Sequence, residues 1–163
     1  MNTALVLFVT VGVGFFTGLR AFAPLAIVSW LAIWGWIPLV GSPLWFMGTN
    51  TFALIVSVVA LGELVGDKLP KTPPRIRAAP LTARMINGAF SAAAVCVAAG
   101  ERWVFGVVFG GLGALAGAFA GYHLRRTIVQ RFRIPDLLVA LIEDLFTIAG
   151  VLFLVRCFFG TTI

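Results

Sequence analysis

Long apolar segments without charged side chains are the feature that most constrains this chain. Within the first 62 residues the only charged side chain is that of Arg20. A helix needs about 20 consecutive apolar residues to cross a bilayer, and a water-soluble fold cannot cover so much continuous apolar surface. Over the whole chain 61% of the residues are hydrophobic and 11% are charged, whereas soluble domains contain about 25% charged residues. The sequence therefore predicts an integral membrane protein.

The apolar segments predict an all-α bundle of six transmembrane helices. The first apolar stretch, residues 3–37, is too long for one span and is interrupted at Gly18-Leu19-Arg20, with Pro24 just beyond. We expect two short helices joined by a turn near Arg20. The alternative is one broken helix with Arg20 buried, which would leave five spans. The remaining spans are expected at residues 51–66, 82–99, 103–122 and 135–159.

Basic residues gather on one side of this topology. With six spans, Arg20, residues 68–84 and residues 125–133 fall on the same side and hold ten of the twelve Lys and Arg residues. Basic loops are retained in the cytoplasm during insertion, so we expect cytoplasmic basic loops and both termini on the opposite, periplasmic side. The same rule accounts for the net charge of +6 without nucleic acid as a partner.

A basic, Pro-rich loop at residues 68–81 divides the chain into two halves of three spans, about residues 1–67 and 82–160. We interpret residues 1–163 as a single transmembrane domain. An odd number of spans repeated in tandem gives an inverted repeat, which is the architecture of many transporters. A 3+3 inverted repeat is therefore a hypothesis for this chain.

Glycines recur at four-residue spacing along several predicted helices. They form the series Gly14/Gly18, Gly62/Gly66, Gly106/Gly110 and Gly113/Gly117/Gly121. Such stripes let helix backbones approach closely in lipid, where the hydrophobic effect does not drive association. We expect packing within one chain, and packing between copies of a homo-oligomer is the alternative.

Ionisable side chains lie inside or at the ends of the predicted spans, toward the basic side. Glu63 and Asp67 are one helical turn apart, and Glu143 and Asp144 lie about two turns into the last span. A charge at that depth costs about 3 kcal/mol or more unless it is paired, protonated or facing water. Similar depths are expected for several basic and polar side chains: Arg20, Lys68, Arg84, Asn87, His123 and Arg126.

These side chains suggest a site for a negatively charged ligand. We expect an anionic solute or a lipid phosphate to bind Arg20, Arg84, Asn87, His123 and Arg126. Ion pairing or proton exchange is expected for Glu63, Asp67, Lys68, Glu143 and Asp144. Common catalytic signatures such as GxSxG, HExxH and the P-loop are missing, so no catalytic residue, metal site or cofactor is predicted.

A small transporter or lipid-translocating protein, with proton coupling through its carboxylates, is thus the leading hypothesis. One alternative is a membrane-embedded lipid or phosphoryl-transfer enzyme whose paired carboxylates hold a divalent ion. The other is a structural or assembly subunit in which the charges only fix the helix register.

The segment from Gly62 to Pro73 reads GELVGDKLPKTP. It resembles the hallmark of an uncharacterised family of small bacterial inner-membrane proteins, a domain of unknown function. The likeness continues through Gly18-Leu19-Arg20-Ala21 and through His123 with Arg126. The resemblance implies a multi-pass protein of the bacterial inner membrane, and it implies no reaction.

Overall fold

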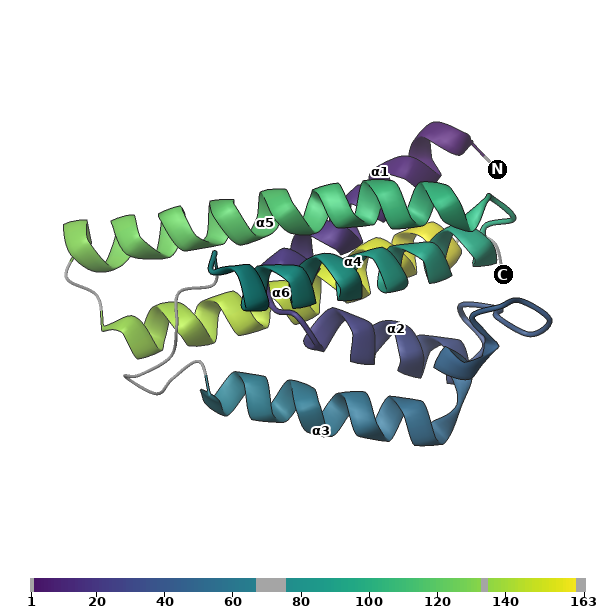
Figure 1. The fold of residues 1–163 in the computed structure, drawn as a ribbon, viewed down its shortest axis with the longest axis horizontal. Coiled ribbons are helices and arrows are strands. Elements are labelled where there is room, and N and C mark those ends of the chain that lie inside the picture. The colour runs from purple at the N-terminus through teal and green to yellow at the C-terminus, as the bar shows by residue number, and fades with distance from the viewer. Residues whose placement is uncertain (1, 67–75, 133–134, 161–163) are drawn as a thin grey trace.

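The computed structural model describes residues 2–66, 76–132 and 135–160, and these residues form an all-α fold, as predicted. Figure 1 shows most of the helices running back and forth along the long axis, with both chain termini at one end of the bundle. The elements are α1 (Thr3–Leu19), α2 (Ala23–Ile33), the short 3-10 helix η1 (Trp45–Gly48), α3 (Asn50–Gly66), α4 (Ala78–Ala98), α5 (Trp103–Phe132) and α6 (Asp136–Phe159).

Three of these helices, α4, α5 and α6, are long and apolar enough to cross a bilayer. Helices α1, α2 and α3 are also apolar but have only 17, 11 and 17 residues. At 1.5 Å per residue, 17 residues cover about 25 Å of a hydrocarbon core that is about 30 Å thick. The described chain thus contains three candidate membrane spans and three shorter apolar helices.

The helix boundaries differ from the predicted ones at two basic segments. The expectation of a loop up to residue 81 is wrong, because α4 already begins at Ala78, with Pro80 in its first turn, where a missing N–H costs no hydrogen bond. The expected end of the fifth span at Tyr122 is also too early, because α5 continues to Phe132. Residues 123–132 contain neither glycine nor proline, so nothing in the sequence stops the helix there.

The predicted 3+3 repeat finds little support in the helix lengths. In such a repeat α2 would correspond to α5, yet α2 has 11 residues and α5 has 30. The shortness of α2 has a local cause, since Gly35 adopts a positive φ of 80° shortly after the helix ends at Ile33.

Helices α1, α4 and α5 form a trio that packs through glycines. A Cβ atom added at Gly14 would overlap the backbone of Gly110 in α5, and one added at Gly106 would overlap the backbone of Ala93 in α4. Close contact between backbones is how small residues hold membrane helices together. The glycine stripes of these helices therefore pack within the chain, whereas Gly62 on α3 has open space around it.

Helices α2 and α3 form a hairpin beside this trio. Within it, the Trp30 Nε1–H donates to Ser57 Oγ at 3.0 Å, and α3 packs mainly against α2 and η1. Helix α6 packs against α1, where the ring of Phe16 meets Phe146 at a centroid distance of 5.4 Å and lies over Gly150. The bundle thus consists of the glycine-packed trio with α6, and of the α2–α3 hairpin.

Candidate functional site

The first two helices are separated by a break at residues 20–22. Helix α1 ends at Leu19, and α2 begins at Ala23 with Pro24 in its first turn. A proline inside a continuous helix would clash with the carbonyl four residues before it, here that of Arg20, and would leave that carbonyl without its donor. Arg20 instead adopts an extended backbone (φ −134°, ψ 118°), and the chain turns back.

The break lies inside the bundle. Arg20 is fully buried and Ala21 is 4% exposed. Asp144, which contacts Arg20, lies about 12 Å along α6 from the start of that helix at Asp136. Irregular backbone at such a depth needs partners from the protein, because lipid offers no hydrogen bonds. The side chains that supply these partners define the candidate site.

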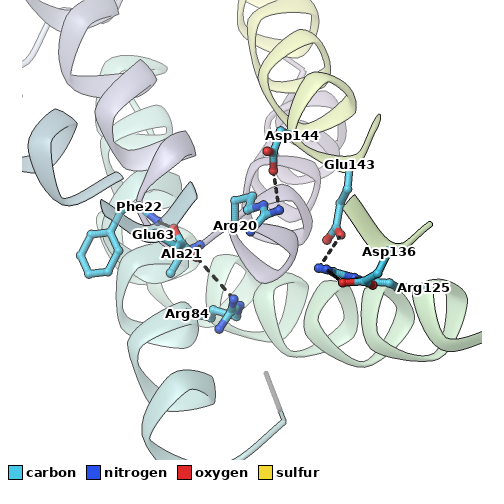
Figure 2. Close-up of polar contacts among 9 residues, drawn as sticks. All are labelled: Arg20, Ala21, Phe22, Glu63, Arg84, Arg125, Asp136, Glu143 and Asp144. Carbon is cyan, nitrogen blue, oxygen red and sulfur yellow. Dashed lines mark hydrogen bonds and ion pairs between the residues drawn. The ribbon is translucent and has the colours of Figure 1, made fainter. Parts of the chain in front are cut away.

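Glu63 of α3 caps the start of α2 (Figure 2). Its Oε1 accepts a hydrogen bond from the Ala21 N–H at 2.8 Å, and its Oε2 accepts one from the Phe22 N–H at 2.9 Å. The N-terminus of a helix carries a partial positive charge, so a carboxylate is favoured there by the helix dipole as well as by the hydrogen bonds. The carboxylate of Glu63 therefore occupies the position at the N-terminus of α2 where an anion is favoured.

Arg84 of α4 contacts the same carboxylate. Its Nη2 lies 3.4 Å from Oε1 of Glu63, and its Nε donates to the Gly18 carbonyl at 3.0 Å. Asn87, about one turn further along α4, donates through Nδ2 to the Ala21 carbonyl at 3.1 Å. Both side chains belong to the buried face of α4. The polar stripe of α4 thus faces the helix break.

Arg20 itself pairs with a helix from the other half of the chain. Its Nη2 lies 2.5 Å from Oδ1 of Asp144 in α6, and the side chains of the two residues are 0% and 10% exposed. Figure 2 shows this pair close to the Glu63–Arg84 pair. We refer to Arg20, Glu63, Arg84, Asn87 and Asp144 as the break cluster. It brings together two guanidinium groups and two carboxylates around the non-helical backbone groups of the break.

A second group of ion pairs joins α5 to α6. Arg125 holds both oxygens of Asp136, with Nε–Oδ1 and Nη2–Oδ2 distances of 2.8 and 2.6 Å, and its Nη1 lies 3.9 Å from Oε2 of Glu143. The side chains of Arg125 and Glu143 are 16% and 11% exposed, whereas that of Asp136 is 58% exposed. This group therefore extends from the protein interior to its surface.

The structure brings together some of the predicted site residues and separates others. The residues of the break cluster were all predicted, and Glu143 lies on the neighbouring α5–α6 contact. His123 and Arg126 are exposed on α5 and take no part in the contacts described above for the cluster. Asp67 and Lys68 lie outside the described residues.

Sequence reasoning missed Arg125 and the pairing role of Asp136. Consecutive residues of a helix point about 100° apart, so only one of Arg125 and Arg126 can face α6. The sequence interpretation places both residues in or beside a loop. It therefore does not assign them to different faces of a helix. The continuous helical pattern through residue 132 was the signal that could have revealed it.

Two buried hydroxyl groups lie on the helices that carry the cluster. Ser91 Oγ of α4 and Thr147 Oγ1 of α6 are fully buried and have no hydrogen-bond partner within the part of the chain that the structure describes. Each is about one helical turn beyond a cluster residue, Asn87 or Asp144. Buried hydroxyl groups usually have a hydrogen-bond partner. Among the described residues, these two groups therefore add unsatisfied polar atoms to the bundle interior beside the cluster.

A family model described as a domain of unknown function (DUF4126) matches residues 7–157, which include the whole break cluster. The chain belongs to this family. The uncharacterised family indicated by the resemblance is therefore confirmed. No curated protein and no solved structure matches the chain.

The carboxylates of this DUF4126 domain are arranged beside guanidinium groups. Glu63 contacts Arg84, Asp144 contacts Arg20, and Glu143 lies near Arg125. Among the described residues, His, Cys, Asp and Glu side chains do not gather in groups of three that could hold a metal ion. The carboxylates of the site are thus paired with guanidinium groups, and Asn87 adds an amide donor.

Proposed function

We propose that this DUF4126 protein is a small membrane transporter for an anionic solute or a lipid phosphate, with the break cluster as its binding site. The observation that carries the proposal is the buried pair of guanidinium groups, Arg20 and Arg84, next to the backbone N–H groups at the start of α2. Many transporters place their substrate site at a break between two helix segments, where a helix N-terminus binds the anionic group.

The cost of burying these charges supports a functional role. Replacing a buried ion pair by apolar side chains of similar size is often neutral or stabilises a protein by about 1–4 kcal/mol. A bundle held by glycine contacts therefore has no need of Arg20 and Asp144 for stability. Ionisable residues inside membrane helices commonly mark pathways for substrates, ions or protons.

Glu63 suggests how an anion enters the site. Its carboxylate receives the two N–H groups of Ala21 and Phe22 and the guanidinium of Arg84, which is the donor set that a phosphate or carboxylate ligand requires. A ligand anion would displace Glu63 from these donors. Protonation of the displaced carboxylate would remove its charge, and this would couple anion binding to proton uptake.

The division of the bundle suggests which part moves. Glycine contacts between backbones make the trio α1, α4 and α5 close-packed, whereas Glu63 is the cluster residue contributed by the α2–α3 hairpin. Release of Glu63 would loosen the hairpin from the trio and open the site. Movement of one group of helices against another around a fixed site is the general scheme of alternating access.

Membrane placement and topology are part of the proposal. We infer six passes, with the short helices α1, α2 and α3 completing the three longer candidate spans, in a bacterial inner membrane. The common end of both termini in Figure 1 agrees with an even number of passes. Basic residues at the end of the bundle opposite the termini favour a cytoplasmic location for the half of the bundle that contains the break cluster.

Transport in reconstituted vesicles tests this function. The purified protein would be placed in liposomes and supplied with inorganic phosphate, chloride, acetate or a phospholipid with a fluorescent headgroup. Uptake of the solutes, movement of the lipid between leaflets and the internal pH would be followed. We expect at least one of these probes to move faster than in protein-free vesicles, and Arg84→Gln to slow it at least tenfold.

Arg126→Gln is the matched control, because Arg126 is an exposed arginine outside the cluster. This variant should transport at the wild-type rate. The proposal is overturned if none of the probes moves above the protein-free rate. It is also overturned if Arg84→Gln, eluting as a folded protein, transports as fast as Arg126→Gln.

A further inference from the structure

An apolar groove runs along the outside of the bundle, away from the break cluster. Its floor follows α4 from Ile86 to Val97, Trp103 and Val107 of α5 form one wall, and Pro43 and Leu44, just before η1, form the other. Every side chain that lines the groove is apolar, and its volume is about 430 Å³. The groove thus separates the loop of the α2–α3 hairpin from the glycine-packed trio.

The dimensions of the groove determine what it can hold. From Ile86 to Val97 the groove extends about 16 Å along α4, at 1.5 Å per residue. The groove is open along the outer surface of the bundle, which lies against lipid in the proposed membrane placement. A wholly apolar groove of this length suits one hydrocarbon chain.

Charge at one end of the groove favours an anionic lipid. Arg102 directly precedes Trp103 and is exposed, and Trp103 is 54% exposed. Tryptophan at a helix end is typical of the level of lipid headgroups, and an arginine there can bind a phosphate. The neighbouring Glu101 carboxylate accepts a hydrogen bond from Thr3 Oγ1 at 2.9 Å. Arg102 is thus an exposed cation next to the Trp103 wall of the groove.

We propose that this groove binds one acyl chain of an anionic phospholipid from the leaflet on the side of the two termini, with its phosphate at Arg102. The chain then runs along Ala89 and Ala93 toward Ile86. The lipid fills the space between the hairpin loop and α4, and so it holds the hairpin against the trio. This site is separate from the anion site at the break and depends only on the membrane placement of the protein.

Native mass spectrometry of the full chain in detergent tests the site, with phosphatidylglycerol and phosphatidylcholine as the probes. Wild-type protein should retain one phosphatidylglycerol per chain, with at least a tenfold preference over phosphatidylcholine. Ala89→Trp fills the groove and should lower this occupancy at least tenfold. Ala116→Trp, at an exposed alanine on α5 outside the groove, is the matched control and should bind as the wild type does.

Arg102→Gln should keep one bound lipid and lose the preference for phosphatidylglycerol. If Ala89→Trp does not elute as a single species, Ala89→Leu provides a smaller filling side chain. Equal lipid occupancy in the Ala89 and Ala116 variants would overturn the proposal, as would an unchanged preference in Arg102→Gln. A wild-type dimer that Ala89→Trp converts to a monomer would show that another protein copy, and not a lipid, occupies the groove.

Discussion

Replacement of Asp144 by asparagine is the substitution whose effect follows most directly from the structure. The change removes the carboxylate from beside Arg20, whose side chain is 0% exposed, and leaves the shape of residue 144 almost unaltered. Removing one partner of a buried ion pair typically destabilises a protein by about 3–5 kcal/mol, because the remaining charge loses its compensation. A membrane interior imposes a cost of similar size, about 3 kcal/mol, on a lone arginine at a helix centre.

The double variant Arg20→Met/Asp144→Val has the opposite expectation. It removes both charges and changes the summed volume of the two side chains little, so its stability should lie within about 1 kcal/mol of the wild type or exceed it. For a protein of this size, about 2–4 °C of melting temperature correspond to 1 kcal/mol. The single variant should therefore melt roughly 6–20 °C lower than the wild type, and the double variant should melt close to it.

Thermal unfolding in detergent, followed by the fraction of monodisperse protein after heating, measures both variants. Arg126→Gln controls for the loss of an exposed charge and should melt as the wild type does. The reasoning is refuted if Asp144→Asn melts within 2 °C of the wild type, a margin of about 1 kcal/mol or less. It is equally refuted if the double variant is as unstable as the single one.

Three further predictions concern the cap, the helix packing and a buried hydroxyl. Glu63→Gln should lower the stability by about 1–3 kcal/mol, because an amide offers one acceptor oxygen to the two N–H groups of Ala21 and Phe22; the melting temperature measures this. Gly14→Leu should prevent recovery of monodisperse protein, because the new side chain overlaps the backbone of α5, whereas Gly62→Leu should purify normally. Ser91→Ala should melt at or above the wild-type temperature, since the hydroxyl has no hydrogen-bond partner among the described residues.

Much of the fold could be predicted from the sequence because apolar runs and breakers act locally. Gly18, Arg20 and Pro24 indicated the break between the first two helices, and the position of Pro135 set the start of α6. The start of α4 and the end of α5 were misplaced for different reasons. Pro80 was taken as part of a loop, although proline is well tolerated in the first turn of a helix. The basic residues after Tyr122 were taken as a sign of a loop, although arginine and glutamine are good helix formers.

The composition of the break cluster was predictable in part. A charge inside an apolar run has to find a partner, so the depth of Arg20, Glu63, Arg84 and Asp144 was enough to expect pairing. The choice of partners was not predictable, because it depends on how the helices are arranged around α1. The capture of the Ala21 and Phe22 N–H groups by Glu63 likewise depends on α3 lying beside the start of α2, which no local pattern encodes.

The rate of anion or lipid movement by the Arg20→Met/Asp144→Val variant tests the central claim most directly. The measurement uses the vesicles described above and the probe that wild-type protein moves, and it requires that the variant be folded and as stable as the wild type. If the buried charges serve transport, the transport rate of this variant falls at least tenfold while the protein keeps its fold. If it transports at the wild-type rate, the charges are not part of the transport site, and the proposed function is contradicted.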